Sequence, residues 1–444
     1  MQAFADFWSS AVDIAWGLPL VVLLVSSGIY FTISSKFLPF RALRHAIDIL
    51  RGKYDNPDDP GEITHFQALT SALSATIGMG NIAGVALAIS VGGAGAIFWM
   101  WIAGLIGMAT KFFTCTLSCM YRKKDEDGIE QGGPMYFIEV GLGKAFKPLA
   151  IVFAVCGMVG CLALYQVNQL AAIVAGDDTT IRIGIGLISM ILVGIVIIGG
   201  IVRVGKVTSR LVPAMAILYF VTALYIVLLN AAMVPEILLT IIKSAFGQEA
   251  VVGGAAGVAF SKVLVTGIKR AAFSNEAGIG TAPMAHGAAK TKEPVREGLI
   301  AMMGPFIDTN IVCTLTALVI LSTGVSAESD GVVMTANAFA TAMPGFGKPI
   351  LILVVSLFAI STMISYSYYG LKCAKYLFGK KRGQWYIYPY LLALPVAAYL
   401  TEDTVINIID TCFAFMAVPT LMSTLLLSRK VIEALKDYYR RMGI

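Results

Sequence analysis

Charged residues are scarce in this sequence. Only 14% of the 444 residues are charged and 57% are hydrophobic, whereas soluble domains carry about 25% charged residues. Apolar runs of roughly 20 residues, the length that crosses a bilayer as a helix, recur along the whole chain. These features exclude an ordinary soluble domain and predict an all-α polytopic membrane protein.

Residues suited to covalent or metal chemistry are also few. The three histidines, His45, His65 and His286, are scattered, and none has a spacing to cysteine that suits zinc. The seven cysteines lie mainly within apolar runs, so no disulfide framework is expected. We find no phosphate-binding loop and no nucleophile elbow in the sequence. We therefore expect no enzyme.

Eleven apolar stretches are expected to form transmembrane helices. The segment before the first stretch carries Asp6 and Asp13 and no basic residue, which argues against a cleaved signal peptide and predicts that this span is retained. The expected spans cover residues 12–33, 67–90, 94–120, 148–175, 181–201, 210–233, 251–287, 298–322, 348–371, 385–400 and 404–427.

Lysine and arginine are concentrated on alternate loops. Of the 33 basic residues, 26 lie in the segments 34–64, 121–147, 203–210, 290–296, 372–382 and 429–441. Because cytoplasmic loops are enriched in lysine and arginine, the N-terminus is expected outside and the C-terminus in the cytoplasm. This topology explains the net charge of +6 better than a nucleic-acid partner would.

Two of the expected spans contain residues that a lipid-facing helix does not need. The span 67–90 contains Gly78-Met79-Gly80-Asn81, and the span 251–287 contains the stretch Phe273–Pro283 with Asn275, Glu276 and two glycines. Gly78-Met79-Gly80 and Gly278-Ile279-Gly280 lie 200 residues apart. Small residues can simply allow close helix packing, but glycine-interrupted helices at matched positions are typical of transporters with inverted repeats.

Without the first span, each stretch lies in the first helix of a five-span half, and the two halves enter the membrane from opposite sides. The expected segments are an extra N-terminal transmembrane helix (1–34), a cytoplasmic loop (35–66), a first five-helix repeat (67–233), an extracellular connection (234–250), a second, inverted five-helix repeat (251–427) and a basic cytoplasmic tail (428–444), which we expect along the inner lipid surface.

A broken helix frees backbone groups that are costly in lipid but useful in a polar cavity. The half-helix that starts near Gly80 would point its positive end at the break, which suits a carboxylate. Carbonyl groups near Phe273 and Ser274 would suit an ammonium group or a hard cation. A site for a negative group beside a site for a positive group suits a zwitterion. The small side chains nearby predict that this zwitterion is a small amino acid.

Long motifs in this chain resemble the alanine/glycine:cation symporter family. They are "TSALSATIGMGNIAGVALAISVGGAGAIFWMWIAGLIGMATK", "GGPMYF", "AFSNEAGIGTAPMAHGAAKT", "FIDTNIVCTLTALVI" and "FAISTMISYSYYG". The resemblance extends from about residue 12 to residue 427. It implies uptake of alanine or glycine coupled to sodium, in some members to protons, across the plasma (inner) membrane. The implied fold is a LeuT-type five-plus-five inverted repeat with one extra N-terminal helix.

The resemblance also implies site residues. The sodium ion would be held by carbonyl groups of Ser74, Ile77 and Ala359 and by the hydroxyl of Thr362, with Ser361 as the neighbouring alternative. Phe273 would close the substrate site. The substrate residues implied are Thr76, Ile77, Gly78, Gly80, Asn81, Gln166, Phe273, Ser274, Asn275, Gly278 and Tyr366.

Three positions depart from the family pattern. Tyr366 stands where many members have tryptophan, Met363 where LeuT-type sodium sites often have serine, and Gln131 where a smaller residue is usual. The first two leave the size of the substrate and the identity of the cation open.

Several polar residues allow a simpler interpretation. Ser361 and Thr362 can bond a carbonyl one turn back in their own helix. Gln166, Asn168 and Gln169 can bind neighbouring helices together, and we expect only Gln166 at the pocket.

Ionisable residues within spans suggest function by default. Arg270 and Asp410 are expected to form a gate, with a static structural pair as the alternative. Glu276 is expected to cap a half-helix, or else to bind the ammonium group or a proton. Asp308 and Lys111 are expected to be structural.

The sequence thus favours a sodium-coupled symporter of alanine or glycine. The alternatives are a proton-coupled transporter of another small amino acid or a nucleobase, and a passive facilitator or channel. Two non-identical broken helices favour alternating access over a pore, which would show rings of like residues. No oligomer is implied.

Overall fold

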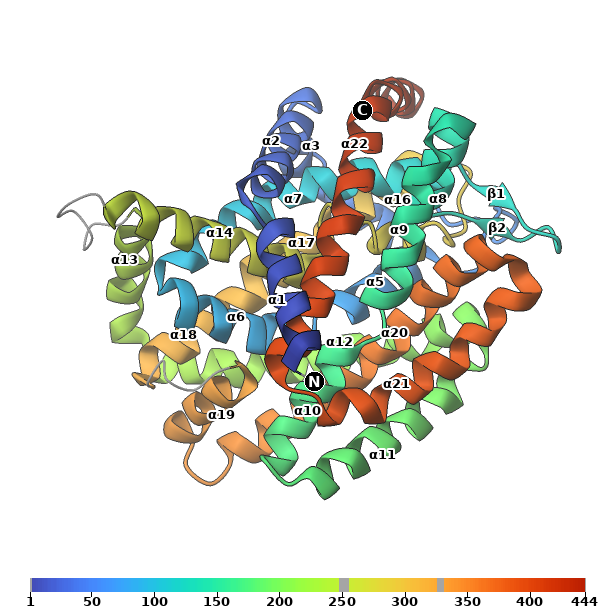
Figure 1. Ribbon diagram of the computed structural model, residues 1–444. Coiled ribbons are helices and arrows are strands. Elements are labelled where there is room, and N and C mark those ends of the chain that lie inside the picture. The colour runs from blue at the N-terminus through green and yellow to red at the C-terminus, as the bar shows by residue number, and fades with distance from the viewer. Residues whose placement is uncertain (1, 247–254, 326–330, 444) are drawn as a thin grey trace.

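The computed structural model describes residues 2–246, 255–325 and 331–443, and nearly all of its regular structure is helical (Figure 1). The first helices are α1 (Gln2–Ala15), α2 (Leu18–Ser34), α3 (Leu38–Arg41), α4 (Leu43–Leu50), α5 (His65–Thr76), α6 (Met79–Gly92) and α7 (Gly95–Met120). A short antiparallel hairpin follows, formed by β1 (Lys123–Lys124) and β2 (Glu130–Gln131).

The middle of the chain continues as α8 (Pro134–Tyr136), the π-helix η1 (Phe137–Gly141), the 3₁₀-helix η2 (Lys144–Phe146), α9 (Lys147–Gly160), α10 (Leu164–Ala175), α11 (Thr179–Ile197), α12 (Gly200–Leu229), the 3₁₀-helix η3 (Ala231–Met233) and α13 (Val234–Ala245). The last part contains α14 (Ala255–Asn275), α15 (Ala282–His286), α16 (Pro294–Ala301), α17 (Met303–Pro305), the π-helix η4 (Phe306–Cys313), α18 (Thr314–Thr323), α19 (Gly331–Ala342), α20 (Gly347–Gly383), the 3₁₀-helix η5 (Gln384–Tyr386), α21 (Ile387–Tyr399) and α22 (Glu402–Met442).

Within the described residues, eight helical segments are long and apolar enough to cross a membrane, and α1 with α2 makes a ninth if this pair, bent by 46°, counts as one span. The predicted number of eleven stays a prediction. Two expected spans, 348–371 and 385–400, lie in one helical run, Gly347–Tyr399, and the expected span 251–287 begins outside the described residues.

Both predicted helix breaks are present. A capping box between Thr64 and Gln67 starts α5. This helix ends at Thr76, and two residues separate it from the start of α6 at Met79. The second break separates α14 from α15. There Gly280 has φ +101°, and a Cβ atom at this position would lie 2.7 Å from Phe153, so this glycine is required both for its conformation and for space.

A third break was not predicted. The expected span 148–175 is divided into α9 and α10, and Ala163 between them has φ +55°. The apolar pattern is continuous across this point, and no glycine follows Gly160 before α10 begins, so periodicity gives no signal.

The broken helices form the centre of the molecule. The most apolar part of α5–α6 is 94% buried, whereas that of α11 is only 28% buried, so α11 lies at the periphery. In the packing, α6 contacts α14 and α19, while α5 contacts α12 and α20. In Figure 1 the helices surround this centre, with α11 and α13 at the margins.

The basic tail continues α22 without interruption to Met442. Tyr438 in this tail is buried, and its hydroxyl lies 2.8 Å from Nε2 of His45 on α4. One face of the tail therefore packs on α4. That the opposite face of the tail lies along the inner lipid surface stays a prediction.

Candidate functional site

The two helix breaks lie against each other. A Cβ atom on Gly80 would lie 2.9 Å from the Cα of Ser274 and 3.5 Å from Cδ1 of Phe273. A Cβ on Gly78 would lie 2.6 Å from the hydroxyl of Thr362 on α20. The glycines therefore allow three helices to approach at one buried point.

Asn81 joins the first break to the second. Its Oδ1 accepts a hydrogen bond from the backbone N–H of Gly78 at 2.8 Å, which caps α6. Its Nδ2 donates to Asp308 Oδ1 at 2.8 Å and to the Ser274 hydroxyl at 3.3 Å. All these groups are buried.

Asp308, which we expected to be structural, is placed by the fold at the junction of the two breaks, a position that the sequence alone did not indicate. Its other carboxylate oxygen accepts hydrogen bonds from the hydroxyls of Ser274 at 2.7 Å and Thr309 at 3.0 Å. Its Oδ1 bonds Asn81, so the carboxylate connects both breaks. Asp308 lies in the π-helix η4, and π-helical turns are frequent at functional sites. The signal in the sequence was an acidic residue within a span.

The predicted sodium residues meet where α5 crosses α20. The Thr362 hydroxyl donates to the Ser74 carbonyl at 2.9 Å, and the Ser74 hydroxyl donates to the Ser361 carbonyl at 2.7 Å. The Ser361 hydroxyl donates to Phe358 in its own helix, in line with its simpler interpretation. Ile77, at the end of α5, and Ala359 are buried nearby along the same two helices.

Gln166 on α10 differs from its polar neighbours. Its Oε1 is buried and has no hydrogen-bond partner among the described residues. Asn168 instead donates to the carbonyl groups of Ala397 and Leu400, and Gln169 accepts from the N–H of Val332. Asn168 and Gln169 thus hold helices together, whereas Gln166 has a buried acceptor without a partner among the described residues.

Tyr366 and Glu276 form a pair inside the second break. The Tyr366 hydroxyl donates to one carboxylate oxygen of Glu276, and the Thr281 hydroxyl donates to the other at 2.5 Å. Glu276 has φ +55° and is buried. Its carboxylate therefore ties α20 to the start of α15, a contact that the sequence did not predict.

Arg270 and Asp410 form a buried ion pair. The Arg270 guanidinium lies 5.3 Å from the centre of the Phe273 ring, which also contacts Tyr165 edge to face. On the other side, both charged residues line a cavity with Asp13. Arg270, Asp410 and Phe273 lie between this cavity and Gly80. We call these three residues the outer lid, after the gate that the sequence predicts, a role that stays a prediction.

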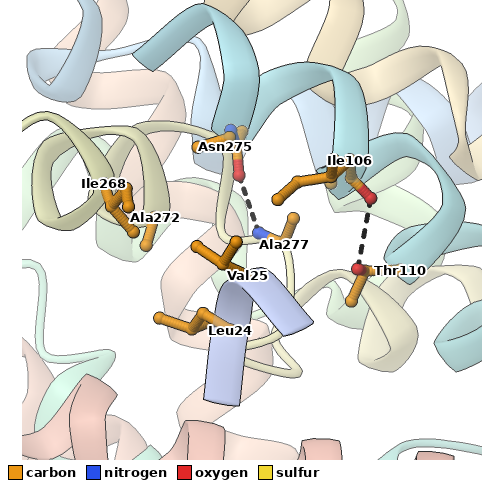
Figure 2. A pocket seen from close by; sticks show the side chains of 10 residues that line it. Leu24, Val25, Ile106, Thr110, Ile268, Ala272, Asn275 and Ala277 are labelled. Carbon is orange, nitrogen blue, oxygen red and sulfur yellow. Dashed lines mark hydrogen bonds between the residues drawn. The ribbon is translucent and has the colours of Figure 1, made fainter. Parts of the chain in front are cut away.

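Three predicted substrate residues have other neighbours. The Thr76 hydroxyl donates to Ala72 within α5. A Cβ on Gly278 would lie 2.9 Å from Leu24 and 3.2 Å from Leu421. Figure 2 shows Asn275 in a cavity lined by α2, α7 and α14, where its Oδ1 accepts from the N–H of Ala277.

The profile of one family, the sodium:alanine symporter family, matches residues 1–443. The chain belongs to this family. The sodium/alanine symporter AgcS of Methanococcus maripaludis is 39% identical over 445 residues, which cover 98% of this chain and 97% of AgcS. An uncharacterized transporter of Haemophilus influenzae is 42% identical over 98% of this chain and 96% of its own length. The probable sodium/glutamine symporter GlnT of Bacillus subtilis is 35% identical over 97% of this chain and 90% of its own length.

Among solved structures, MhsT in complex with L-phenylalanine matches with a TM-score of 0.60 over 83% of this chain and 89% of that chain, at 13% identity. This match shows the LeuT-type fold. Membership of the sodium:alanine symporter family makes the chain an integral multi-pass membrane transporter and not an enzyme.

Proposed function

We propose that this symporter takes up alanine, glycine or both, driven by sodium flowing inward, and that it works by alternating access. The observation that carries this proposal is the meeting of the two helix breaks, where a Cβ atom on Gly80 would lie only 2.9 Å from the Cα of Ser274. Two unwound segments at one buried point supply backbone groups of both polarities. A small zwitterion is the ligand that uses both.

The substrate carboxylate is assigned to the start of α6, at Gly78, Gly80 and Asn81. A helix N-terminus favours an anion. The ammonium group is assigned to the carbonyl groups at the end of α14, near Phe273 and Ser274. Gln166 supports this assignment, because a buried acceptor without a partner is costly and an ammonium donor would satisfy it.

Of the remaining predicted substrate residues, Ile77 and Tyr366 are assigned to the walls of this pocket. Thr76, Asn275 and Gly278, which have the other neighbours described above, would contribute only through the backbone shape of the two breaks. The Phe273 ring beside Gly80 and Gly84 leaves little space, which favours alanine or glycine over a larger side chain. The relative GlnT is named a probable sodium/glutamine symporter, so membership of the family alone does not define the size of the substrate.

The sodium ion is assigned to the α5–α20 crossing. The Ser74 carbonyl and the Thr362 hydroxyl lie 2.9 Å apart, and Ile77, Ala359 and Ser361 complete the set. Hard cations prefer oxygen ligands. A sodium ion between the two oxygens would replace the hydrogen bond of Thr362, whose hydroxyl would then offer its lone pairs.

A proton as coupling ion is the second candidate. It is favoured by one observation, the buried carboxylate of Asp308 with donors from both breaks. Protonation of a carboxylate at this point would respond to substrate in the adjacent break. Asp308 has no ion-pair partner among the described residues, although the buried Lys111 is close enough to act on its carboxylate electrostatically. An unpaired buried charge is costly, so Asp308 is the position at which a proton would bind.

The wider organisation follows the same proposal. The chain would contain eleven transmembrane helices, an extra one at 1–34 and two inverted five-helix repeats at 67–233 and 251–427, joined by 35–66 and 234–250. The N-terminus would lie outside, and the tail 428–444 in the cytoplasm. The outer lid would close the path from outside, and its Arg270–Asp410 pair would open when the site is empty.

Uptake by purified protein in proteoliposomes tests this function. With an inward sodium gradient we expect radiolabelled alanine and glycine to accumulate above the external concentration. Dissipating the sodium gradient should abolish accumulation, whereas dissipating a proton gradient should not. Equilibration without accumulation would indicate a facilitator, and accumulation driven by protons alone would favour Asp308 as the coupling site.

A further inference from the structure

An apolar cavity lies where α20 ends and α21 begins, at a point that the substrate and sodium sites do not use. Its volume is about 520 Å³, and it is formed by α9, α20, η5 and α21, which pack together on one side of the molecule (Figure 1). Met158, Phe378, Trp385 and Tyr388 are among its lining residues, and Arg382 is the only charged residue among the described residues that line it. We call it the α20–α21 cavity.

Close packing fixes the wall of this cavity. The Tyr386 hydroxyl donates to the Met158 carbonyl at 2.6 Å, which joins η5 to α9. The Tyr386 ring fills the space beside Gly370, where even a Cβ atom would not fit. At the end of α20, a Cβ on Gly383 would lie 2.5 Å from the Cα of Lys375, so the turn folds tightly back on its own helix. The cavity is therefore preformed, as ligand sites usually are.

Three of the lining side chains are aromatic and exposed. Trp385, Tyr388 and Phe378 are 68%, 60% and 56% exposed, and the ring centres of Trp385 and Tyr388 lie 5.5 Å apart. Tryptophan and tyrosine are enriched where the hydrocarbon of a bilayer meets its headgroups, because their rings are amphipathic. In the proposed topology this end of α20 is cytoplasmic, so we expect the cavity to open at the inner surface of the bilayer.

Arg382 gives the cavity its charge. Its neighbour Lys380 is paired with Asp127, whereas the Arg382 guanidinium has no ion pair and no side-chain hydrogen bond among the described residues. An unpaired guanidinium beside an apolar cavity suits a ligand that combines an anionic head with hydrocarbon. Arginine binds phosphate through parallel hydrogen bonds, and basic pockets between transmembrane helices on the cytoplasmic side bind anionic lipid headgroups.

We propose that the α20–α21 cavity binds an anionic phospholipid of the cytoplasmic leaflet, with its phosphate on Arg382 and an acyl chain against Phe378 and Met158. A soluble anion would leave the apolar wall in contact with water, and a lipid without net charge would be attracted less by the guanidinium. The acyl chain lies beside the contact of Tyr386 with Met158, two residues before α9 ends. The lipid thus steadies the helix that precedes the break at Ala163. This inference goes beyond the proposed symport and uses only its topology.

Photolabelling of the purified whole chain in phosphatidylcholine vesicles tests the proposal. The probe is phosphatidylglycerol with a diazirine in one acyl chain, and labelled residues are mapped by mass spectrometry. We expect labelling of Met158 and of segment 378–389 to exceed that of α11, which is largely exposed at the periphery. Unlabelled phosphatidylglycerol should compete for the cavity, whereas phosphatidylcholine and inorganic phosphate should not. Labelling no stronger than that of α11 would overturn the proposal, and so would competition by inorganic phosphate, the sign of a site for a free anion.

Arg382→Gln removes the guanidinium and keeps the apolar wall. At a low fraction of probe, we expect labelling of the cavity to fall roughly tenfold, the equivalent of one charged hydrogen bond. Arg382→Lys keeps the charge and should lose less. Arg210→Gln is the matched control, since Arg210 on α12 is also exposed and has no ion pair with a described residue.

Equal labelling of the cavity in Arg382→Gln and Arg210→Gln would contradict an anionic headgroup on Arg382. The assay contains neither sodium nor alanine. Failure of the lipid site would therefore leave the proposed symport intact, whereas absence of sodium-driven uptake in proteoliposomes would contradict the symport and not the lipid site.

Discussion

Gly80 lies where the two helix breaks come closest. Any side chain at this position would collide with the backbone of Ser274, since even a Cβ atom would be only 2.9 Å from its Cα. We expect Gly80→Leu to abolish alanine uptake without preventing folding, because the site is filled and the breaks are pushed apart.

Gly84→Ala is the matched control, since a Cβ at Gly84 would meet Phe273 at an ordinary 3.7 Å. Uptake is measured together with the elution profile of the detergent-solubilised protein. Normal alanine uptake by Gly80→Leu would place the substrate elsewhere.

Thr362 is the proposed side-chain ligand for sodium at the α5–α20 crossing. Thr362→Ala removes the hydroxyl that faces the Ser74 carbonyl. We expect the half-saturating sodium concentration for uptake to rise roughly tenfold or more, the equivalent of one lost contact to a charged group. Recognition of alanine at saturating sodium should change less.

Ser361→Ala should have a smaller effect than Thr362→Ala, because the Ser361 hydroxyl bonds within its own helix. If Thr362→Ala leaves the sodium dependence unchanged, sodium binds elsewhere or the coupling ion is a proton at Asp308 or Glu276.

Tyr366 combines ring volume with a hydrogen bond to Glu276. Tyr366→Trp adds a side-chain volume that approaches that of a methyl group. In a tight pocket, a difference of one methyl group changes the discrimination between two substrates by about 1–3 kcal/mol. We therefore expect the preference to shift towards glycine by roughly tenfold, as measured by competition between glycine and alanine.

Tyr366→Phe separates the two contributions. It keeps the ring and removes one donor from a buried carboxylate, so uptake should fall with little change in the glycine-to-alanine ratio. An unchanged ratio in Tyr366→Trp would mean that this ring packs between helices outside the pocket.

At the scale of elements, the glycine stretches predicted both helix breaks because residue type alone marks them. Gly278 and Gly280 have positive φ, and Gly78 and Gly80 stand at close approaches. The break before α10 has no such mark, since Ala163 carries the positive φ there. The structure thus adds a discontinuity that composition and periodicity cannot show.

The outer lid is also an arrangement of elements, because α14 supplies Arg270 and Phe273 while α22 supplies Asp410. We expect Arg270→Gln to reduce uptake by more than tenfold, since it removes the cation between Asp410 and the Phe273 ring.

Lys269→Gln is the matched control. Lys269 also pairs with Asp410, at 2.8 Å, but lies over Trp16 on the side of the cavity. Equal losses of uptake in Arg270→Gln and Lys269→Gln would indicate a static structural pair and no lid.

At the scale of the whole molecule, the sequence alone predicted the membrane class, the family and a site between two broken helices. It could not predict the contacts that depend on packing between distant segments. Asp308 reaches Asn81, 227 residues earlier, and Glu297 reaches His65, 232 residues earlier. From the sequence alone, Asp308 was expected to be structural and no role was expected for Glu297, because the partners of both residues are defined only by the fold.

The same reason separates residues within one motif. Gln166 and Asn168 are two positions apart in a polar run, yet only Gln166 keeps a free acceptor among the described residues. Asn275 belongs to the second glycine stretch but lines a cavity with α2. A motif predicts where a site lies, whereas packing decides which side chain faces it.

The central claim is that sodium and substrate bind on adjacent faces of the first break and are coupled through it. Its most direct test is equilibrium binding of radiolabelled alanine to the purified protein over a series of sodium concentrations, with the reciprocal sodium titration. We expect sodium to raise the affinity for alanine by a factor in the usual range of roughly 5 to 150, and alanine to raise the affinity for sodium by the same factor. Alanine binding that does not change with sodium would contradict this account.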